Sequence, residues 1–329
     1  MEDFRSLFNS FSSLKVGVIG DLMLDTYMWG GVERISPEAP VPVVSLQKKE
    51  YRVGGAGNVA LNCKSLGARV SVLSVVGDDA EGMMLTDLLD GHQVDSAYIV
   101  VSGKRITTSK TRIISRNQQM MRLDSEVTTD LDHTDEEALL QRISDFISRE
   151  DPDIIIFEDY NKGVLTEKLI HRTIEKCREA GVLTAVDPKR KNFFSYRHAD
   201  IFKPNLKEVR EGLNMLTDEV DSKKLSHIHE ELKKILHHSL SLVTLSEKGI
   251  FYSDGTHSGQ IPSHLRNISD VSGAGDTVIA VASIVYAATR NAHLMAEVAN
   301  IAGGLVCEEV GTVAISREKL LNECELLLS

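Results

Sequence analysis

Short hydrophobic runs that end abruptly at a polar residue or a glycine recur along the chain. These runs cover residues 16–19, 70–76, 154–157, 182–186, 200–202 and 242–245. Runs of this length, without alternation of polarity, are typical of strands that are buried on both faces of a parallel sheet. Segments of helical length, such as 136–147 and 167–180, lie between some of them. The pattern therefore predicts a βαβ array with a mostly parallel central sheet.

The residues that directly follow these runs are candidates for a ligand site. Open parallel sheets bind ligands beyond the carboxyl ends of their strands. The punctuating residues include Gly20-Asp21, Glu158-Asp159, Asp187-Pro188-Lys189 and Lys203-Pro204-Asn205. Any one of them also fits ordinary loop chemistry, so the prediction rests on their recurrence.

Two segments, about 40–53 and 105–124, interrupt this pattern. Both are polar, rich in β-branched and long side chains, and lack a helical stripe. They predict antiparallel strands that stand off the main sheet as a small lid, and a pair of irregular surface loops is the alternative. No linker or low-complexity tract divides the chain, so residues 1–329 are expected to form a single domain.

The amino-terminal segment has Phe4, Leu7, Phe8 and Phe11 at helical spacing, together with acidic residues. It predicts a short amphipathic helix packed on the domain, not a signal or transit peptide. The longest nearly apolar stretch, 278–288, is well short of the roughly 20 residues of a membrane span. The four cysteines lack CxxC or metal-site spacing, which indicates free thiols in a reducing compartment. A cytoplasmic protein is therefore expected.

The net charge of the chain bears on which kinds of partner it can bind. The 329 residues carry a formal net charge of −11, whereas nucleic-acid and anionic-membrane partners normally require a basic face. We therefore expect neither partner. An anionic small molecule would have to be bound by a local cluster of basic side chains.

The most informative motif for chemistry is the stretch 270–277, which is followed by a helix-like apolar segment. Its small residues Gly273, Ala274 and Gly275 would let a ligand approach the backbone, and a helix that begins there points free N–H groups at an anion. Asp276 could accept a hydroxyl proton beside that anion. The alternative is a glycine-rich turn in which Asp276 is only a helix cap.

This stretch resembles the second signature of the ribokinase (PfkB) family. The first signature also has a counterpart in Gly54-Gly55-Ala56-Gly57-Asn58, followed by Leu66-Gly67-Ala68. A dinucleotide-binding loop and a P-loop are not supported, because neither the GxGxxG spacing nor a following GK[ST] is present. Two signatures in the order of the family are much harder to obtain by chance than either one alone.

The resemblance implies a three-layer αβα fold, with a mostly parallel central sheet and a small antiparallel β lid. It also implies an ATP- and Mg²⁺-dependent sugar kinase that pairs as a homodimer through its lid strands. Gly273, Ala274 and Gly275 would form the anion hole, and Asp276 would be the catalytic base. Contacts to the sugar are implied for Asp21, Asp25, Gly54, Gly55 and Asn58.

The nucleotide side of the site is also implied by the resemblance. Asn205-Leu206-Lys207-Glu208 resembles the NxxE element of the family, in which Asn205 and Glu208 would hold Mg²⁺ and the ATP phosphates, Glu208 through water. Ser246 and Gly249 lie in a stretch similar to the nucleotide-proximal loop, although Ser246 replaces the commoner glycine. Asn300 falls on a late helix that would wall the adenine site.

Four further stretches, 34–42, 115–119, 122–124 and 159–163, resemble the heptose kinases of lipopolysaccharide-core biosynthesis. These enzymes phosphorylate D-glycero-β-D-manno-heptose 7-phosphate at the anomeric oxygen. A sugar-phosphate acceptor would suit the basic residues of these stretches and of the lid. The additional candidate substrate contacts are Arg34, Lys110, Arg112, Arg116, Asn117, Gln118, Arg122, Asp159 and Lys162.

Strand alternation predicts how these basic residues are oriented. Lys110, Arg112 and Arg116 share parity and would project to one face of a regular strand, as would Arg122 if no bulge intervenes. The alternative for each of these residues is a solvated position on the strand surface without a ligand-binding role.

Two other hypotheses remain: a kinase for a different sugar or sugar phosphate, and a sugar-binding regulator that has lost its catalytic activity. A nicotinamide-dependent dehydrogenase is disfavoured because its phosphate fingerprint is missing. Many heptose kinases carry a C-terminal nucleotidyltransferase domain with an HxGH motif. No HxGH occurs here, so that domain is not expected within these residues.

Overall fold

The computed structural model describes residues 3–116, 118–215 and 221–328. Within these ranges, eight strands form a central sheet in the order β14-β13-β12-β11-β10-β9-β1-β4. The six strands from β12 to β4 run parallel, and β13 and β14 are antiparallel additions at one edge. The bounds are β1 Lys15–Gly20, β4 Arg69–Leu73, β9 Ile154–Glu158, β10 Leu183–Asp187, β11 Ile201–Phe202, β12 Leu240–Thr244, β13 Ile250–Ser253 and β14 Ser258–Ile261.

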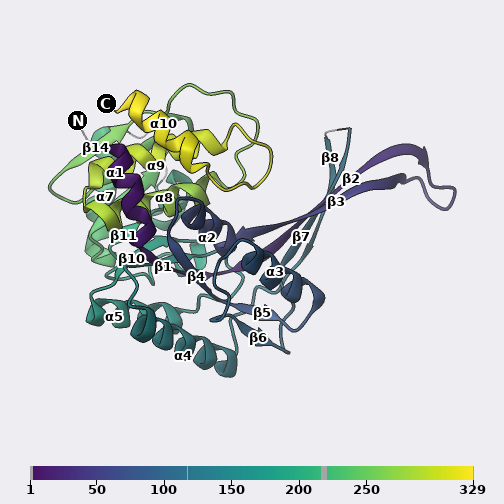
Figure 1. Ribbon diagram of the computed structural model, residues 1–329, viewed down its shortest axis with the longest axis horizontal. Helices are drawn as coiled ribbons and strands as arrows, with labels where there is room; N and C mark the ends of the chain where they lie inside the picture. Colours follow the sequence, from purple (N-terminus) through teal and green to yellow (C-terminus); the bar gives the residue numbers. More distant parts are fainter. Residues whose placement is uncertain (1–2, 117, 216–220, 329) are drawn as a thin grey trace.

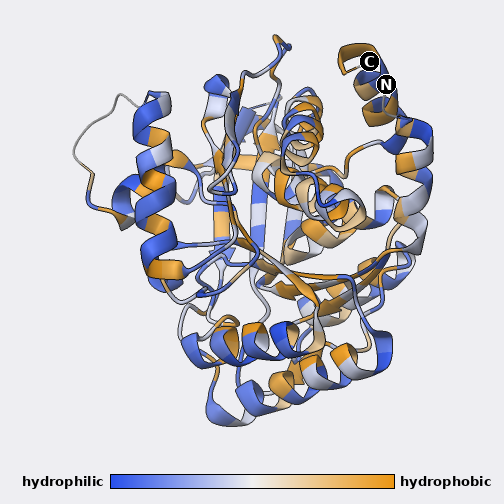
Figure 2. Cartoon of the chain, turned by 90° about the vertical axis from the view of Figure 1, so that its left-hand side faces the viewer, coloured by the Kyte–Doolittle hydropathy of each residue, from blue (hydrophilic) through white to orange (hydrophobic). Residues whose placement is uncertain are grey.

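Helices cover both faces of this sheet and give three layers (Figures 1 and 2). One hydrophobic core lies between the sheet and α1 (Phe4–Ser10), α2 (Ala56–Ser65), α3 (Ala80–Gly91), α8 (Ala274–Thr289), α9 (Ala292–Val306) and α10 (Arg317–Leu327). The other lies beneath α4 (His133–Glu150), α5 (Glu167–Ala180), α6 (Leu206–Gly212) and α7 (Ser222–Leu236). Short 3₁₀ turns occur at Phe11–Ser13, Arg190–Asn192 and Ser246–Lys248.

A second sheet projects from this body as a long lid (Figure 1). Its strand order is β3-β2-β7-β8, with β2 at Leu22–Ile35, β3 at Pro42–Gly55, β7 at Ser109–Ser115 and β8 at Gln118–Ser125. The β2/β3 and β7/β8 pairs are antiparallel hairpins, and the central β2/β7 pair is parallel. A separate two-stranded sheet joins β5 (Val75–Gly77) to β6 (Val100–Ser102).

The predicted fold class is confirmed, with two differences in its elements. The run 70–76 was predicted as one strand, but it breaks at Ser74, whose hydroxyl donates to the Gly20 carbonyl at 2.6 Å. The residues before and after Ser74 belong to different sheets. The lid also contains a strand that the sequence did not predict, β2, which pairs with the predicted segment 40–53 along almost its full length.

The amino-terminal helix packs as its spacing predicts. Phe4 and Phe8 are buried, and Arg5 pairs with Glu325 of α10 at 2.8 Å, so the two ends of the described chain lie side by side (Figure 1). All four cysteines are free thiols. Among the described helices, none is both long enough and apolar enough to cross a bilayer.

A buried histidine pair lies between α7 and β12, away from the lid. His229 and His238 both contact the Ser241 hydroxyl, at 2.9 and 2.6 Å, and their rings meet edge to face. The Phe202 ring lies against His238 on another side. Burial, with smaller contributions from His229 and Lys233, lowers the pKa of His238 to about 3. Burial also lowers the pKa of His229.

This pair predicts a loss of stability in mild acid. At pH 5 the folded His238 stays neutral, whereas an unfolded histidine with a pKa near 6.5 takes up a proton. Stability is therefore lost as the pH falls from about 6.5 towards 3, and His238 alone contributes about 2 kcal/mol of the loss between pH 7 and pH 5. Urea unfolding at the two pH values should show this difference shrinking in His238→Gln. Exposed His227→Gln, on the same helix, is the control; an equal pH dependence in both variants would contradict the assignment.

Candidate active site

The motif around residue 273 forms the amino terminus of a 16-residue helix, α8. Gly273 is the N-cap and has a φ of +78°, a conformation that favours glycine. A Cβ atom at Gly273 would also lie 2.8 Å from Nδ2 of Asn58. The first-turn N–H groups of a helix have no intrahelical acceptor, so Ala274, Gly275 and Asp276 present donors and the positive end of the helix dipole. This is an anion-binding geometry.

Asp276 is buried, with 4% of its surface exposed, and both of its oxygens are oriented. Nδ2 of Asn58 donates to Oδ2 at 2.7 Å, and the Tyr160 hydroxyl donates to Oδ1 at 2.7 Å. Burial raises the pKa of Asp276 above its usual range, and these two hydrogen bonds oppose that effect. The result is a fixed carboxylate beside an anion hole, which is the arrangement that a general base requires.

Asp21 and Asp159 use their carboxylates to hold the loop after β9. Asp21 accepts backbone N–H bonds from Tyr160, Lys162 and Val164 at 2.8 to 3.1 Å. Burial, with the charge of Asp159, raises the pKa of Asp21 to about 6. Asp159 accepts from the Asn161 backbone and the Tyr196 hydroxyl, both at 2.8 Å. The two aspartates therefore set the position of Tyr160 and Lys162.

The base of the lid contains paired charges. Arg112 of β7 bonds Asp25 of β2, and its guanidinium lies over the Tyr27 ring. A Cβ atom at Gly54 would meet the Asp25 carboxylate, so the absence of a side chain there leaves room for this pair.

Glu126, directly after β8, bonds two lysines. Its carboxylate contacts Lys162 at 2.7 Å and Lys110 at 3.4 Å, and Lys110 also contacts Asp124 at 3.4 Å. The sugar-side candidates Lys110, Arg112 and Lys162 therefore lie among acidic partners at the inner end of the lid.

Arg34, Arg116 and Gln118 lie farther out on the lid, whereas Arg122 lies directly opposite Arg112. Arg34 is twelve residues beyond Leu22 on β2, which corresponds to roughly 40 Å of strand. Arg116 is in the turn between β7 and β8, and Gln118 is exposed at the start of β8. Arg122 is paired with Asp124 through two bonds of 2.8 and 2.9 Å. Asn117 lies outside the described residues.

The predicted shared face of the basic residues is wrong for Arg116. Strand β7 ends at Ser115, and Arg116 follows it with a φ of +49°, so the alternation of the strand does not extend to Arg116. Arg112 and Arg122 are direct cross-strand partners and share a face.

The candidate residues on the nucleotide side form hydrogen bonds and packing contacts with other residues of the protein. Asn205 and Glu208 form a capping box at the start of α6, with both bonds at 2.8 Å, and Glu208 also bonds Lys189 at 2.8 Å. Leu206 is half-buried against the hydrophobic core, and Lys207 is exposed. Asn300 of α9 donates to the Pro262 carbonyl at 2.8 Å.

The loop after β12 takes unusual backbone conformations. Ser246 and Gly249 both have positive φ values, +54° and +89°. A Cβ atom at Gly249 would overlap the Ile261 carbonyl, so this position requires glycine. The loop is therefore held close to the end of β14.

Sequence reasoning assigned no role to several buried groups beside Asp276. Lys203, directly after β11, pairs through its Nζ with Oδ2 of Asp187 at 2.7 Å. A Cβ atom built on Gly275 would lie 3.7 Å from each of these two atoms. Tyr160 orients Asp276. The Glu158 carboxylate lies close to those of Asp187 and Asp276. The signal for these residues was their position at the carboxyl ends of strands, which marked the edge of the sheet without giving individual roles.

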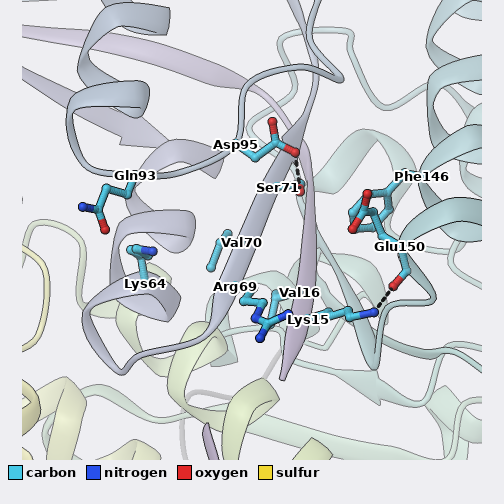
Figure 3. Close-up of a pocket in the computed structure, with 10 residues that line it drawn as sticks. All are labelled: Lys15, Val16, Lys64, Arg69, Val70, Ser71, Gln93, Asp95, Phe146 and Glu150. Carbon is cyan, nitrogen blue, oxygen red and sulfur yellow. Dashed lines mark hydrogen bonds between the residues drawn. The ribbon is translucent and has the colours of Figure 1, made fainter. Parts of the chain in front are cut away.

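The cavity in Figure 3 lies at the other end of the sheet. It measures about 280 Å³ and is lined by Lys15 and Arg69 at the amino ends of β1 and β4, and by Glu150 at the end of α4. Lys15 already donates to the Glu150 carbonyl at 2.6 Å. A second cavity of about 330 Å³ is lined by Arg52, Asn58 and Thr312 and so reaches the Asp276 cluster through Asn58.

The fold and this site define a carbohydrate kinase. Residues 13–319 match the model of the pfkB family carbohydrate kinases, and the chain belongs to that family. Two solved structures share the fold. Phosphofructokinase-2 from Escherichia coli has a TM-score of 0.80 at 17% identity, covering 96% of this chain and 99% of that one. Ribokinase from Arabidopsis thaliana has a TM-score of 0.70 at 18% identity, covering 94% and 98%.

Closer relatives in sequence carry the name Bifunctional protein HldE. The protein from Magnetococcus marinus is 40% identical over 314 residues, which is 94% of this chain and 64% of that protein. The protein from Geobacter sulfurreducens is 38% identical over 323 residues, or 97% of this chain and 65% of that protein. The chain thus spans slightly less than two thirds of these relatives.

Proposed function

We propose that the protein transfers the γ-phosphoryl group of ATP to the anomeric O1 of D-glycero-β-D-manno-heptose 7-phosphate. The product would be heptose 1,7-bisphosphate, an intermediate on the way to ADP-heptose and the lipopolysaccharide core. The observation that carries the kinase chemistry is Asp276, held by Asn58 and Tyr160 beside the α8 amino terminus. The choice of heptose rests on the similarity to proteins named HldE.

The residues of this chain have defined roles in that reaction. Asp276 accepts the O1 proton as O1 bonds to the γ-phosphorus, and the bond from that phosphorus to the ADP oxygen breaks. The α8 amino terminus donates N–H bonds to the charge on the transferring group. Lys203, beside Gly275, adds a positive charge at the same place. Ser246, Gly249 and Asn300 remain proposed contacts on the nucleotide side.

Family membership implies ATP together with a divalent metal, which we propose to be Mg²⁺. When bound, the metal would neutralise charge on the phosphates. The chain fits such an ion, because the buried Glu158 carboxylate has no hydrogen-bond partner in the described ranges. Asn205 and Glu208 would contribute to the metal site through water, since their side chains already cap α6 and bond Lys189.

The 7-phosphate would be bound at the inner end of the lid. Lys110 and Lys162 already converge on one carboxylate, Glu126, and Arg112 is fixed next to them by Asp25. A phosphate dianion can take over charge-assisted bonds of this kind. Asp25, Gly54 and Gly55 would line the sugar between this cluster and Asp276.

We also propose a cytoplasmic homodimer that forms through the lid. Large apolar side chains are exposed on or beside the lid strands, far from the hydrophobic cores: Ile35, Val41, Leu46, Met120, Met121 and Leu123. Exposed apolar groups gathered in this way favour association with another protein surface. A second copy of the chain is the occupant that the family suggests.

A direct test is to incubate the protein with ATP, Mg²⁺ and a panel of sugars and sugar phosphates. Phosphorus NMR would then locate each new phosphate. We expect a new anomeric phosphate on heptose 7-phosphate, formed faster than on any other acceptor. Preference for another sugar would retain the kinase and overturn the substrate, and no transfer to any acceptor would favour a sugar-binding regulator.

A further inference from the structure

Three carboxylates that no binding role above uses together meet at the carboxyl edge of the central sheet. Glu158 ends β9 and Asp187 ends β10, and the two are direct partners in neighbouring parallel strands. Their side chains therefore lie on the same face of the sheet. Asp276 approaches from the first turn of α8, and oxygen atoms of all three lie within 4.8 Å of one another.

Glu158 differs from the other two acids in its partners. Asp187 bonds Lys203, and Asp276 bonds Asn58 and Tyr160. Glu158 is fully buried, yet neither of its carboxylate oxygens has a hydrogen-bond partner among the residues described. Buried carboxylates are normally paired or coordinate a metal ion, so this orphaned group points to a ligand other than the described residues.

The surrounding charges favour a cation with two positive charges. The ammonium groups that face Glu158 are those of Lys189 and Lys203. Lys203 lies against Asp187 at 2.7 Å, and Lys189 is shared between Asp187 at 3.7 Å and Glu208 at 2.8 Å. Four carboxylates, those of Glu158, Asp187, Glu208 and Asp276, thus face two ammonium groups.

We infer that Glu158 and Asp187 directly bind one divalent cation, at a site that exists before nucleotide arrives. Hard cations such as Mg²⁺ prefer oxygen ligands, and kinase sites commonly combine one or two carboxylates with substrate phosphates. Asp187 faces the proposed anion hole at Gly275, so a cation held there would neutralise charge on the phosphoryl group that the proposed reaction transfers. Asn205 and Glu208 would reach this ion only through water, because their side chains already cap α6 and bond Lys189. The existence of the site does not depend on which sugar is phosphorylated.

The test is a titration of nucleotide-free and sugar-free protein with Mn²⁺, followed by electron paramagnetic resonance. We expect one bound Mn²⁺ per chain, and an affinity at least about tenfold weaker in Glu158→Gln, since this change removes a ligand charge with little change in shape. The control is Glu137→Gln. Glu137 belongs to the other acid-rich group, with His133 and Glu136, and it already pairs with Lys168.

Thermal unfolding supplies a second readout. Mn²⁺ should raise the Tm of the wild type and of Glu137→Gln, because it binds the folded state, and should raise that of Glu158→Gln much less. Glu158→Ala should behave like Glu158→Gln, which guards against an effect peculiar to one substitution. In EDTA, Glu158→Gln should be at least as stable as the wild type, because it removes an unpaired buried charge.

Three outcomes would overturn the inference: no Mn²⁺ bound by the wild type without nucleotide, unchanged affinity in Glu158→Gln, or a loss of affinity in Glu137→Gln. The first would leave a protonated Glu158 as the explanation of the orphaned group. Because the titration contains no acceptor, its result stands whether or not heptose 7-phosphate proves to be the substrate.

Discussion

Asp276→Asn should reduce kcat by about 10²- to 10⁴-fold, the usual contribution of a general base. The side chain keeps its size, so the Asn58 and Tyr160 neighbours and the α8 amino terminus should stay in place. What is lost is the ability to take the acceptor proton while the phosphoryl group is transferred. Nucleotide affinity should change little, because the N–H groups of the anion hole belong to the backbone.

Steady-state kinetics with saturating ATP and acceptor measures this effect, and calorimetric titration with a non-hydrolysable ATP analogue measures nucleotide binding. Asp87→Asn, an exposed substitution on α3, is the matched control and should leave both unchanged. Turnover near the wild-type value in Asp276→Asn would remove this carboxylate from the proton transfer. A parallel collapse of nucleotide binding would instead indicate that α8 had been disturbed.

Lys162→Ala should reduce kcat/KM for heptose 7-phosphate by roughly 10- to 100-fold, the loss of one charged contact of about 1.5 to 3 kcal/mol. The reaction with unphosphorylated heptose should be much less affected, because that acceptor has no group for the ammonium to bind. The substitution keeps the backbone N–H that Lys162 donates to Asp21 at 3.0 Å, so the loop after β9 should stay in place.

The ratio of kcat/KM for the two acceptors is the measurement, in wild type and variant. Arg116→Ala provides the control from the outer end of the lid and should leave the ratio unchanged. If the wild type uses both acceptors equally well, the proposed phosphate site does not exist. If the wild type discriminates and Lys162→Ala does so equally, the phosphate is bound by other residues.

The central sheet could be predicted because its strands carry their own signal. The run 154–157 forms β9, and the segment 167–180 forms α5 with the bounds that its pattern indicates. Local signals also mark both ends of helix α5: Thr166 caps its start, and Gly181, with a φ of +73°, ends it. Such features depend on neighbours in sequence and need no knowledge of the tertiary fold.

The missed parts depend on distant pairings. The strand β2 contains Gly30-Gly31 and becomes exposed along its length, so it lacks a buried-strand pattern, and its parallel partner β7 begins only at Ser109. The Asp276 environment similarly joins Asn58, 218 residues away, to Tyr160, 116 residues away. The motif identified the aspartate, but only the tertiary structure shows which donors orient it.

One junction connects the lid directly to the helix that orients the Asp276 carboxylate. Strand β3 ends at Gly55 and α2 begins at Ala56, so no residue intervenes between lid and helix. Asn58, in the first turn of α2, donates to Asp276. A tilt of the lid about Gly55 would therefore move the Asn58 side-chain amide, which aligns Asp276. In the proposed kinase, closure of the lid over the acceptor would thereby be coupled to alignment of the base, which would limit transfer of phosphate to water while the acceptor is absent.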